Sequence, residues 1–146
     1  MKNFRVWGLA VLLLAWAGLA SAQQRSYSEG PVLVVTSVKV MDGQFENYMH
    51  YLDTTYKALM ESSKEAGMIL DYSVFSASPR GPDDADLYLV VTYPNMAMLD
   101  GLDDKMEPVM AKVTKMNLAQ RDEASGKRTV MRTILGSEMI RELKLK

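Results

Sequence analysis

The stretch VLVVTSVKV at residues 32–40 decides the fold class. Its β-branched residues suit a pleated strand, and side chains two positions apart point to the same side. One side would carry Val32, Val34, Thr36, Val38 and Val40. We therefore expect the first strand here, with an apolar face directed at a core.

Helical spacing begins directly after this strand. Asp42 and Gly43 interrupt the alternation, and Asp42 is a suitable N-cap. Apolar residues then recur every three or four positions, as on one face of a helix. They are Phe45, Met49, Leu52, Tyr56, Leu59 and Met60. The pattern predicts a helix over residues 43–66, ended by Gly67.

Two further strands are expected on either side of a loop. Residues 68–75 and 87–93 alternate with period two and are rich in Val, Leu and Tyr. Residues 76–86 between them contain Pro79, Gly81, Pro82 and three aspartates, a composition typical of a loop.

The C-terminal part predicts a second helix and a last strand. Pro94 ends the third strand, and apolar spacing indicates a helix that begins near residue 104 and ends near residue 125. A strand starts at about Lys127. Residues 136–146 fit either a further strand or a terminal helix, because alternating Leu and Lys compete with good helix formers such as Glu138.

The resulting order is strand, helix, strand, strand, helix, strand. It predicts an α+β fold of the ferredoxin-like βαββαβ kind, an antiparallel sheet with two helices on one face. The opposite face of the sheet would also carry Val and Leu, so a monomer would expose it to water. We expect another molecule to cover it.

The N-terminus has the three parts of a secretory signal peptide. Lys2 and Arg5 precede an uncharged run over residues 6–20, and small residues at 20–22 provide a cleavage site. The run is too short for an ordinary membrane-spanning helix, which needs roughly 20 residues. We expect a signal peptide at 1–22, a polar N-terminal segment at 23–30 and a single domain at 31–146. The product would be exported to the periplasm or medium, without a membrane anchor after cleavage.

The amino-acid composition limits the kinds of partner and cofactor that the protein can have. The chain has 17 basic residues, and losing Lys2 and Arg5 would leave 15 against 18 acidic ones, a net charge of −3. This balance argues against nucleic acid as a partner. There is no cysteine, so lipid attachment and disulfides are excluded. The chain has 12 methionines, but no cluster of His or Cys accompanies them, so we expect no metal site. We also expect no cofactor.

The element order resembles the dimeric α+β-barrel proteins over nearly the whole mature chain. The likeness includes the Pro94–Asn95 entry into an interrupted second helical part and the long C-terminal strand region from Arg128. This resemblance implies a homodimer whose two sheet faces meet. The family includes cofactor-independent monooxygenases of the antibiotic-biosynthesis type. Haem-degrading relatives use Trp, Asn and His on the second helix, whereas both tryptophans here lie in the expected signal peptide.

Few side chains are candidates for ligand binding or catalysis. Tyr56, Tyr72 and Tyr93 could line a pocket between helices and sheet, although aromatic residues at this spacing also serve as core. His50, the sole histidine, could act as a base, or it is an ordinary surface residue. Asp71 could be an acid or base if buried, or a hydrated residue on an edge strand.

Three functions fit this pattern. The first is a dimeric protein that binds a small apolar or aromatic molecule between helices and sheet. The second is a cofactor-independent monooxygenase-like enzyme. The third is a non-catalytic interaction module of the cell envelope. An aromatic-walled cavity would favour the first, and a sealed interior the third.

Overall fold

A computed structural model describes residues 24–146. The signal peptide expected at residues 1–22 lies outside the described part. Within that part, no helix combines the length and apolar character needed to cross a membrane.

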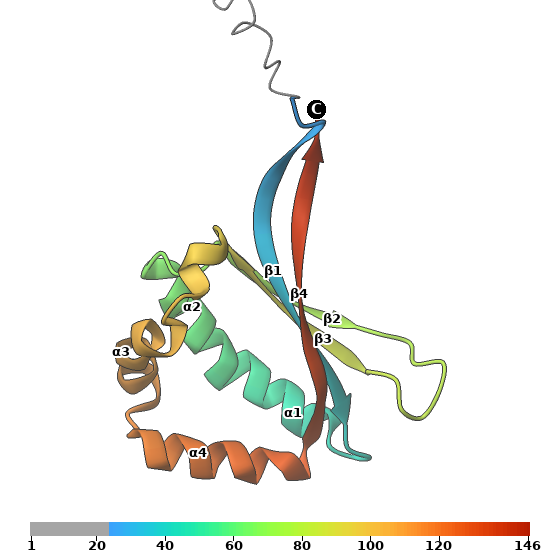
Figure 1. The fold of residues 1–146 in the computed structure, drawn as a ribbon. Coiled ribbons are helices and arrows are strands. Elements are labelled where there is room, and N and C mark those ends of the chain that lie inside the picture. The colour runs from blue at the N-terminus through green and yellow to red at the C-terminus, as the bar shows by residue number, and fades with distance from the viewer. Residues whose placement is uncertain (1–23) are drawn as a thin grey trace, which may run out of the picture.

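The core of the fold is one antiparallel sheet of four strands in the order β2-β3-β1-β4 (Figure 1). Its strands are β1 (Tyr27–Val40), β2 (Asp71–Ser76), β3 (Leu87–Tyr93) and β4 (Arg132–Leu145). The central strand β1 pairs with β3 on one side and β4 on the other. The expected first strand is confirmed and is longer than expected, because it takes in residues 27–30 of the polar segment.

Helices connect β1 to β2 and β3 to β4, and they lie on one side of the sheet (Figure 1). The first connection contains α1 (Phe45–Tyr51), a π-helical turn η1 (Leu52–Tyr56) and α2 (Lys57–Glu65). The second contains the 3-10 turns η2 (Met96–Leu99) and η3 (Arg128–Val130), with α3 (Leu102–Thr114) and α4 (Leu118–Lys127) between them. The α+β class is confirmed.

The second helical part differs from the single helix expected. Lys115 ends α3 in the left-handed conformation, with φ of 56°. Asn117 then starts α4 with a capping box, in which its side chain and that of Gln120 accept each other's backbone N–H groups. The apolar spacing runs on across this break, which is why the sequence pattern merged two helices into one.

The C-terminal tail is a strand. Residues 136–146, which fitted strand or helix, belong to β4 up to Leu145. Their partner is the early part of β1, with Tyr27 opposite Leu145 and Val32 opposite Arg141. On the N-terminal side of Gly30, β1 and the end of β4 form a two-stranded arm that extends past the rest of the sheet (Figure 1).

The helix-facing side of the sheet forms the core. Val38 and Leu87 are fully buried against Tyr48 and Leu52 of the first helical part. Val32 and Tyr93 pack in a second cluster with Met60, Met68, Ile69 and Met106. The alternation of residues 32–40 thus directs its apolar side at the helices, as expected.

The opposite side, here called the open sheet face, also carries apolar side chains. The strand register places Val35 beside Val90, Leu33 beside Ile140, and Phe75 beside Tyr88. Phe75 is 53% exposed, and Ile140 is 46% exposed. The helices between strands lie on the other side of the sheet (Figure 1).

Candidate ligand-binding site

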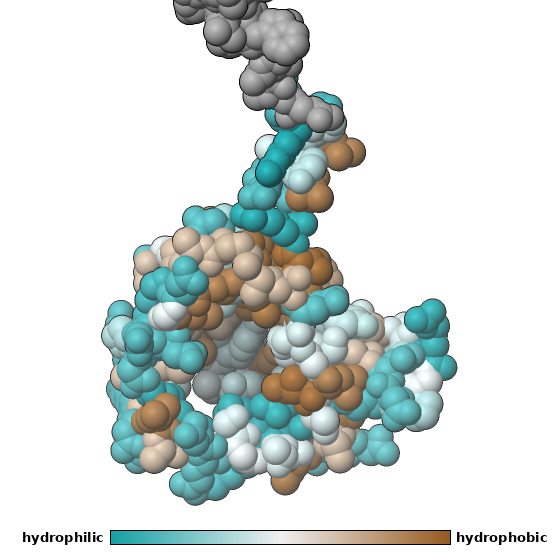
Figure 2. Space-filling model, viewed as in Figure 1, coloured by the Kyte–Doolittle hydropathy of each residue, from teal (hydrophilic) through white to brown (hydrophobic). Residues whose placement is uncertain are grey.

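A broad hollow of about 1120 Å³ lies between the first helical part and the α3–α4 pair. Figure 2 shows it as a depression near the middle of the molecule. All of its lining residues come from helices and the turns that join them. Apolar side chains supply most of its inner wall, including Leu59, Met110, Val113, Met116 and Leu118.

The π-helical turn η1 forms part of one wall. Tyr51, Thr54 and Thr55 line the hollow at this turn. The Thr54 hydroxyl donates a 2.7 Å hydrogen bond to the carbonyl oxygen of His50. Its proton is therefore not available to a ligand. Single π turns within α-helices are rare and occur frequently at functional sites. Here the irregular turn lies directly at the hollow.

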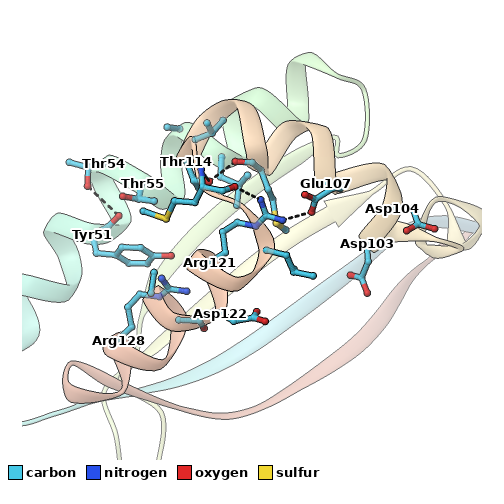
Figure 3. A pocket seen from close by; sticks show the side chains of 18 residues that line it. Tyr51, Thr54, Thr55, Asp103, Asp104, Glu107, Thr114, Arg121, Asp122 and Arg128 are labelled. Atoms are coloured by element: carbon cyan, nitrogen blue, oxygen red, sulfur yellow. Dashed lines mark hydrogen bonds and ion pairs between the residues drawn. The ribbon is translucent and has the colours of Figure 1, made fainter.

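An ion pair holds the opposite wall together. Arg121 of α4 pairs with Glu107 of α3, and its other terminal nitrogen donates a 2.8 Å hydrogen bond to the carbonyl oxygen of Met116. This guanidinium holds the pKa of Glu107 below its usual range. The pair therefore stays charged and braces the two helices beside the hollow (Figure 3).

One end of the hollow combines aromatic rings with a cation. The Arg128 guanidinium lies 4.9 Å from the centre of the Tyr51 ring, within cation–π range. Tyr51 in turn stacks on Tyr48 with ring centres 5.9 Å apart. Tyr48 is 2% exposed, and burial raises the pKa of its phenol. This buried ring fixes the position of Tyr51, and so of the arginine above it.

The three predicted pocket tyrosines come together elsewhere. Tyr56 and Tyr72 meet edge to face with ring centres 6.1 Å apart, and Tyr93 belongs to the same core cluster. None of the three lines the hollow. The Tyr72 hydroxyl donates a 2.6 Å hydrogen bond to Glu61. They pack as core in this structure, and their role in ligand binding stays a prediction.

The two candidate acid or base residues, His50 and Asp71, lie apart from the hollow. His50 is exposed on α1 and does not line it. Asp71 is exposed at the start of β2 and forms a 2.9 Å ion pair with Lys64, which lowers the pKa of the carboxyl. A carboxylate held ionised in water is a weak proton acceptor. Within residues 24–146, neither side chain forms a hydrogen bond with the side chain of Tyr56, Tyr72 or Tyr93.

The Tyr56 hydroxyl gives a test of this core assignment. It is buried and has no hydrogen-bond partner within the described residues, and burial raises its pKa. An unsatisfied buried polar group is destabilising, so Tyr56→Phe should raise the free energy of unfolding by about 1 kcal/mol. Chemical denaturation followed by far-UV circular dichroism would measure this. Tyr72→Phe, which removes a satisfied hydroxyl, is the matched control and should bring no gain. A loss of stability in Tyr56→Phe would show that the hydroxyl has a partner.

The sequence signals for the hollow were present but weak. Tyr51, Glu107 and Arg121 are ordinary helix residues in the sequence, and none belongs to a recognisable motif. Arg128 was expected in the last strand, starting at about Lys127, but it lies in the turn η3, and β4 begins only at Arg132. Glu107 and Arg121 are 14 positions apart on what the pattern predicted as one helix. Only a break between α3 and α4 lets their side chains face each other.

Comparison with known proteins supports the fold. No family model matches the chain. No curated protein matches it either. Among solved structures, the crystal structure of HapK from Hahella chejuensis is similar, with a TM-score of 0.50 and 10% sequence identity. The match covers 76% of this chain and 91% of HapK. Together with the antiparallel sheet, this likeness supports a ferredoxin-like α+β fold.

Proposed function

We propose that the protein is exported as a ferredoxin-like homodimer, a dimeric α+β barrel, that binds a small, mostly apolar or aromatic molecule. The binding site is the hollow between the helices. We propose the hollow in place of the helix-to-sheet pocket expected from the sequence, because Tyr56, Tyr72 and Tyr93 belong to a core cluster and do not line the hollow. The export part of the proposal rests on the pattern of residues 1–22.

The hollow is the observation that carries the proposal. Its volume of about 1120 Å³ is slightly above the usual range of roughly 300–1,000 Å³ for small-molecule pockets. Its wall has the composition typical of such sites, apolar side chains with a few polar groups at defined positions. Methionines at 110 and 116 add side chains that can adapt to different ligands.

Homodimer formation rests on the open sheet face. Val35, Val90 and Leu33 lie in its middle, and Phe75, Tyr88 and Ile140 extend the patch toward the edges. A contiguous apolar patch of this kind is unusual on a protein that stays monomeric. A second copy of the same face provides a matching apolar surface, as a symmetric dimer requires. The arm, with Leu145 at 85% exposure, would reach onto the partner.

Electrostatics makes two of the ion-paired carboxylates poor candidates for a general base. A general base works best with a pKa near the working pH. The pKa values of Asp71 and Glu107 are instead lowered by Lys64 and Arg121. Both carboxylates therefore take up a proton less readily than an ordinary carboxylate.

The proposal predicts that filling the hollow abolishes binding. Ala58 lines the hollow on α2, whereas Ala111 is exposed on α3 and does not line it. Ala58→Trp should lower the affinity for the neutral fluorophore N-phenyl-1-naphthylamine at least about tenfold, which is roughly 1.4 kcal/mol. Fluorescence titration of the mature protein would measure it.

Ala111→Trp is the control for adding a large ring to a helix surface. Its affinity should match that of the wild type. Equal affinity in Ala58→Trp and wild type, or no binding by the wild type at all, would rule out the hollow as the site.

A further inference from the structure

We infer that the ligand carries an acidic group, a carboxylate or sulfonate, next to its apolar body, and that Arg128 binds this group. The inference rests on the proposed function of the hollow and specifies the class of ligand. Four observations lead to it: the free charge of Arg128, its fixed position, the neighbouring hydroxyls, and the separation of charges along the hollow.

The first observation is that the two arginines of the hollow differ. Arg121 is committed to Glu107 and to the carbonyl oxygen of Met116. Arg128 is half-buried and lines the same hollow, yet within residues 24–146 no carboxylate lies at ion-pair distance from it. A half-buried charge without a carboxylate partner is only partly compensated by the Tyr51 ring, and an anionic ligand would complete the compensation.

The second observation is that Arg128 is held in place. Its backbone N–H bonds to carbonyl oxygens of the last turn of α4, and its own carbonyl accepts a 2.9 Å hydrogen bond from Met131. Its guanidinium lies over Tyr51, which is stacked on the buried Tyr48. A guanidinium fixed in this way loses little conformational entropy when it binds a carboxylate.

The third observation concerns the neighbouring donors. In Figure 3 the Tyr51 ring and the Arg128 guanidinium lie on the same side of the hollow, and Thr55 lies on the helix beside them. The hydroxyls of Tyr51 and Thr55 make no hydrogen bond within the described part of the chain. Both can donate to an anion held by Arg128. The planar guanidinium can form two parallel hydrogen bonds to a carboxylate.

The fourth observation is that two of the acidic residues that line the hollow lie at its other end. Figure 3 shows Asp103 and Asp104 at the far end of the hollow. Asp122 acts on Arg121, whose positive charge it supports. Leu59, Met110 and Val113 lie along the wall and suit an apolar body. This arrangement fits an aromatic acid and disfavours a cationic ligand at the Arg128 end.

Two probes with the same ring system test the inference. 1-Anilinonaphthalene-8-sulfonate carries an anion, and N-phenyl-1-naphthylamine is neutral. Arg128→Gln should weaken binding of the sulfonate by about tenfold and leave the neutral probe unchanged, as expected for the loss of a charge-assisted hydrogen bond. Retained binding of the neutral probe would show that the hollow is intact in the variant. Ala58→Trp should weaken both probes, which places them in the hollow.

Lys127→Gln is the matched control, because it removes a charge from the preceding, exposed position of α4. It should affect neither probe. Equal losses for both probes in Arg128→Gln, or no loss for the sulfonate, would overturn the role of Arg128 and leave the hollow as a site for neutral ligands. Absence of binding by either probe to the wild type would overturn both this inference and the proposed function.

Discussion

Val35→Lys is expected to convert the proposed homodimer into a folded monomer, with a dissociation constant raised by about 100-fold or more. Val35 lies on β1 in the middle of the open sheet face, between Val90 and Glu138 of the neighbouring strands. In a symmetric dimer the substitution would bring one lysine from each protomer into the contact, and removing these charges from water is costly even beside Glu138. Sedimentation velocity over a range of concentrations would measure the change.

The lysine is chosen because it is compatible with the monomer. Its cross-strand neighbour Glu138 offers a carboxylate on the same face, and opposite charges at such positions are mildly stabilising. Met96→Lys is the control, since Met96 is exposed on η2, in the helical connection between β3 and β4. It should leave the dissociation constant unchanged. A wild-type protein that is monomeric at micromolar concentration would contradict the dimer, and so would a Val35→Lys variant that self-associates like the wild type.

The sheet could be predicted from the sequence because local pattern and burial agree there. Residues 87–93 alternate, end at a proline and form β3 with the expected bounds. The first helical part was also predicted correctly except in two respects. The π-helical turn η1 leaves no trace in apolar spacing, and the N-cap is Gln44 instead of the expected Asp42. Gly67 ends that part as expected, with φ of 71°.

The candidate site could not be predicted in the same way. The tyrosines at 56, 72 and 93 belong to one core cluster, which was one of the two interpretations that the sequence allowed, and none of them lines the hollow. The hollow depends on the angle between α3 and α4, which is set by Lys115, Asn117 and the ion pair of Arg121. Such an angle arises from contacts between distant residues, and no periodicity in the chain encodes it.

The second large effect is expected on stability, on the side of the sheet that faces the helices. Leu87 of β3 is 1% exposed and packs with Val38, Tyr48 and Leu52. Leu87→Ala should lower the free energy of unfolding by about 3 kcal/mol, because it removes buried methyl groups and leaves a cavity in a close-packed core. Urea denaturation followed by far-UV circular dichroism suits a mature chain that would contain no tryptophan.

Tyr88 separates this effect from assembly, because adjacent residues of a strand point to opposite faces. It is 37% exposed on the open sheet face, beside Phe75. Measured in the monomeric Val35→Lys background, Tyr88→Ala should lower the stability much less than Leu87→Ala. In the wild-type background, where we propose a dimer, Tyr88→Ala should instead weaken self-association. Equal losses of stability for the two variants in the monomer would mean that the face of Tyr88 is already covered within one chain, and the reason for a dimer would then be gone.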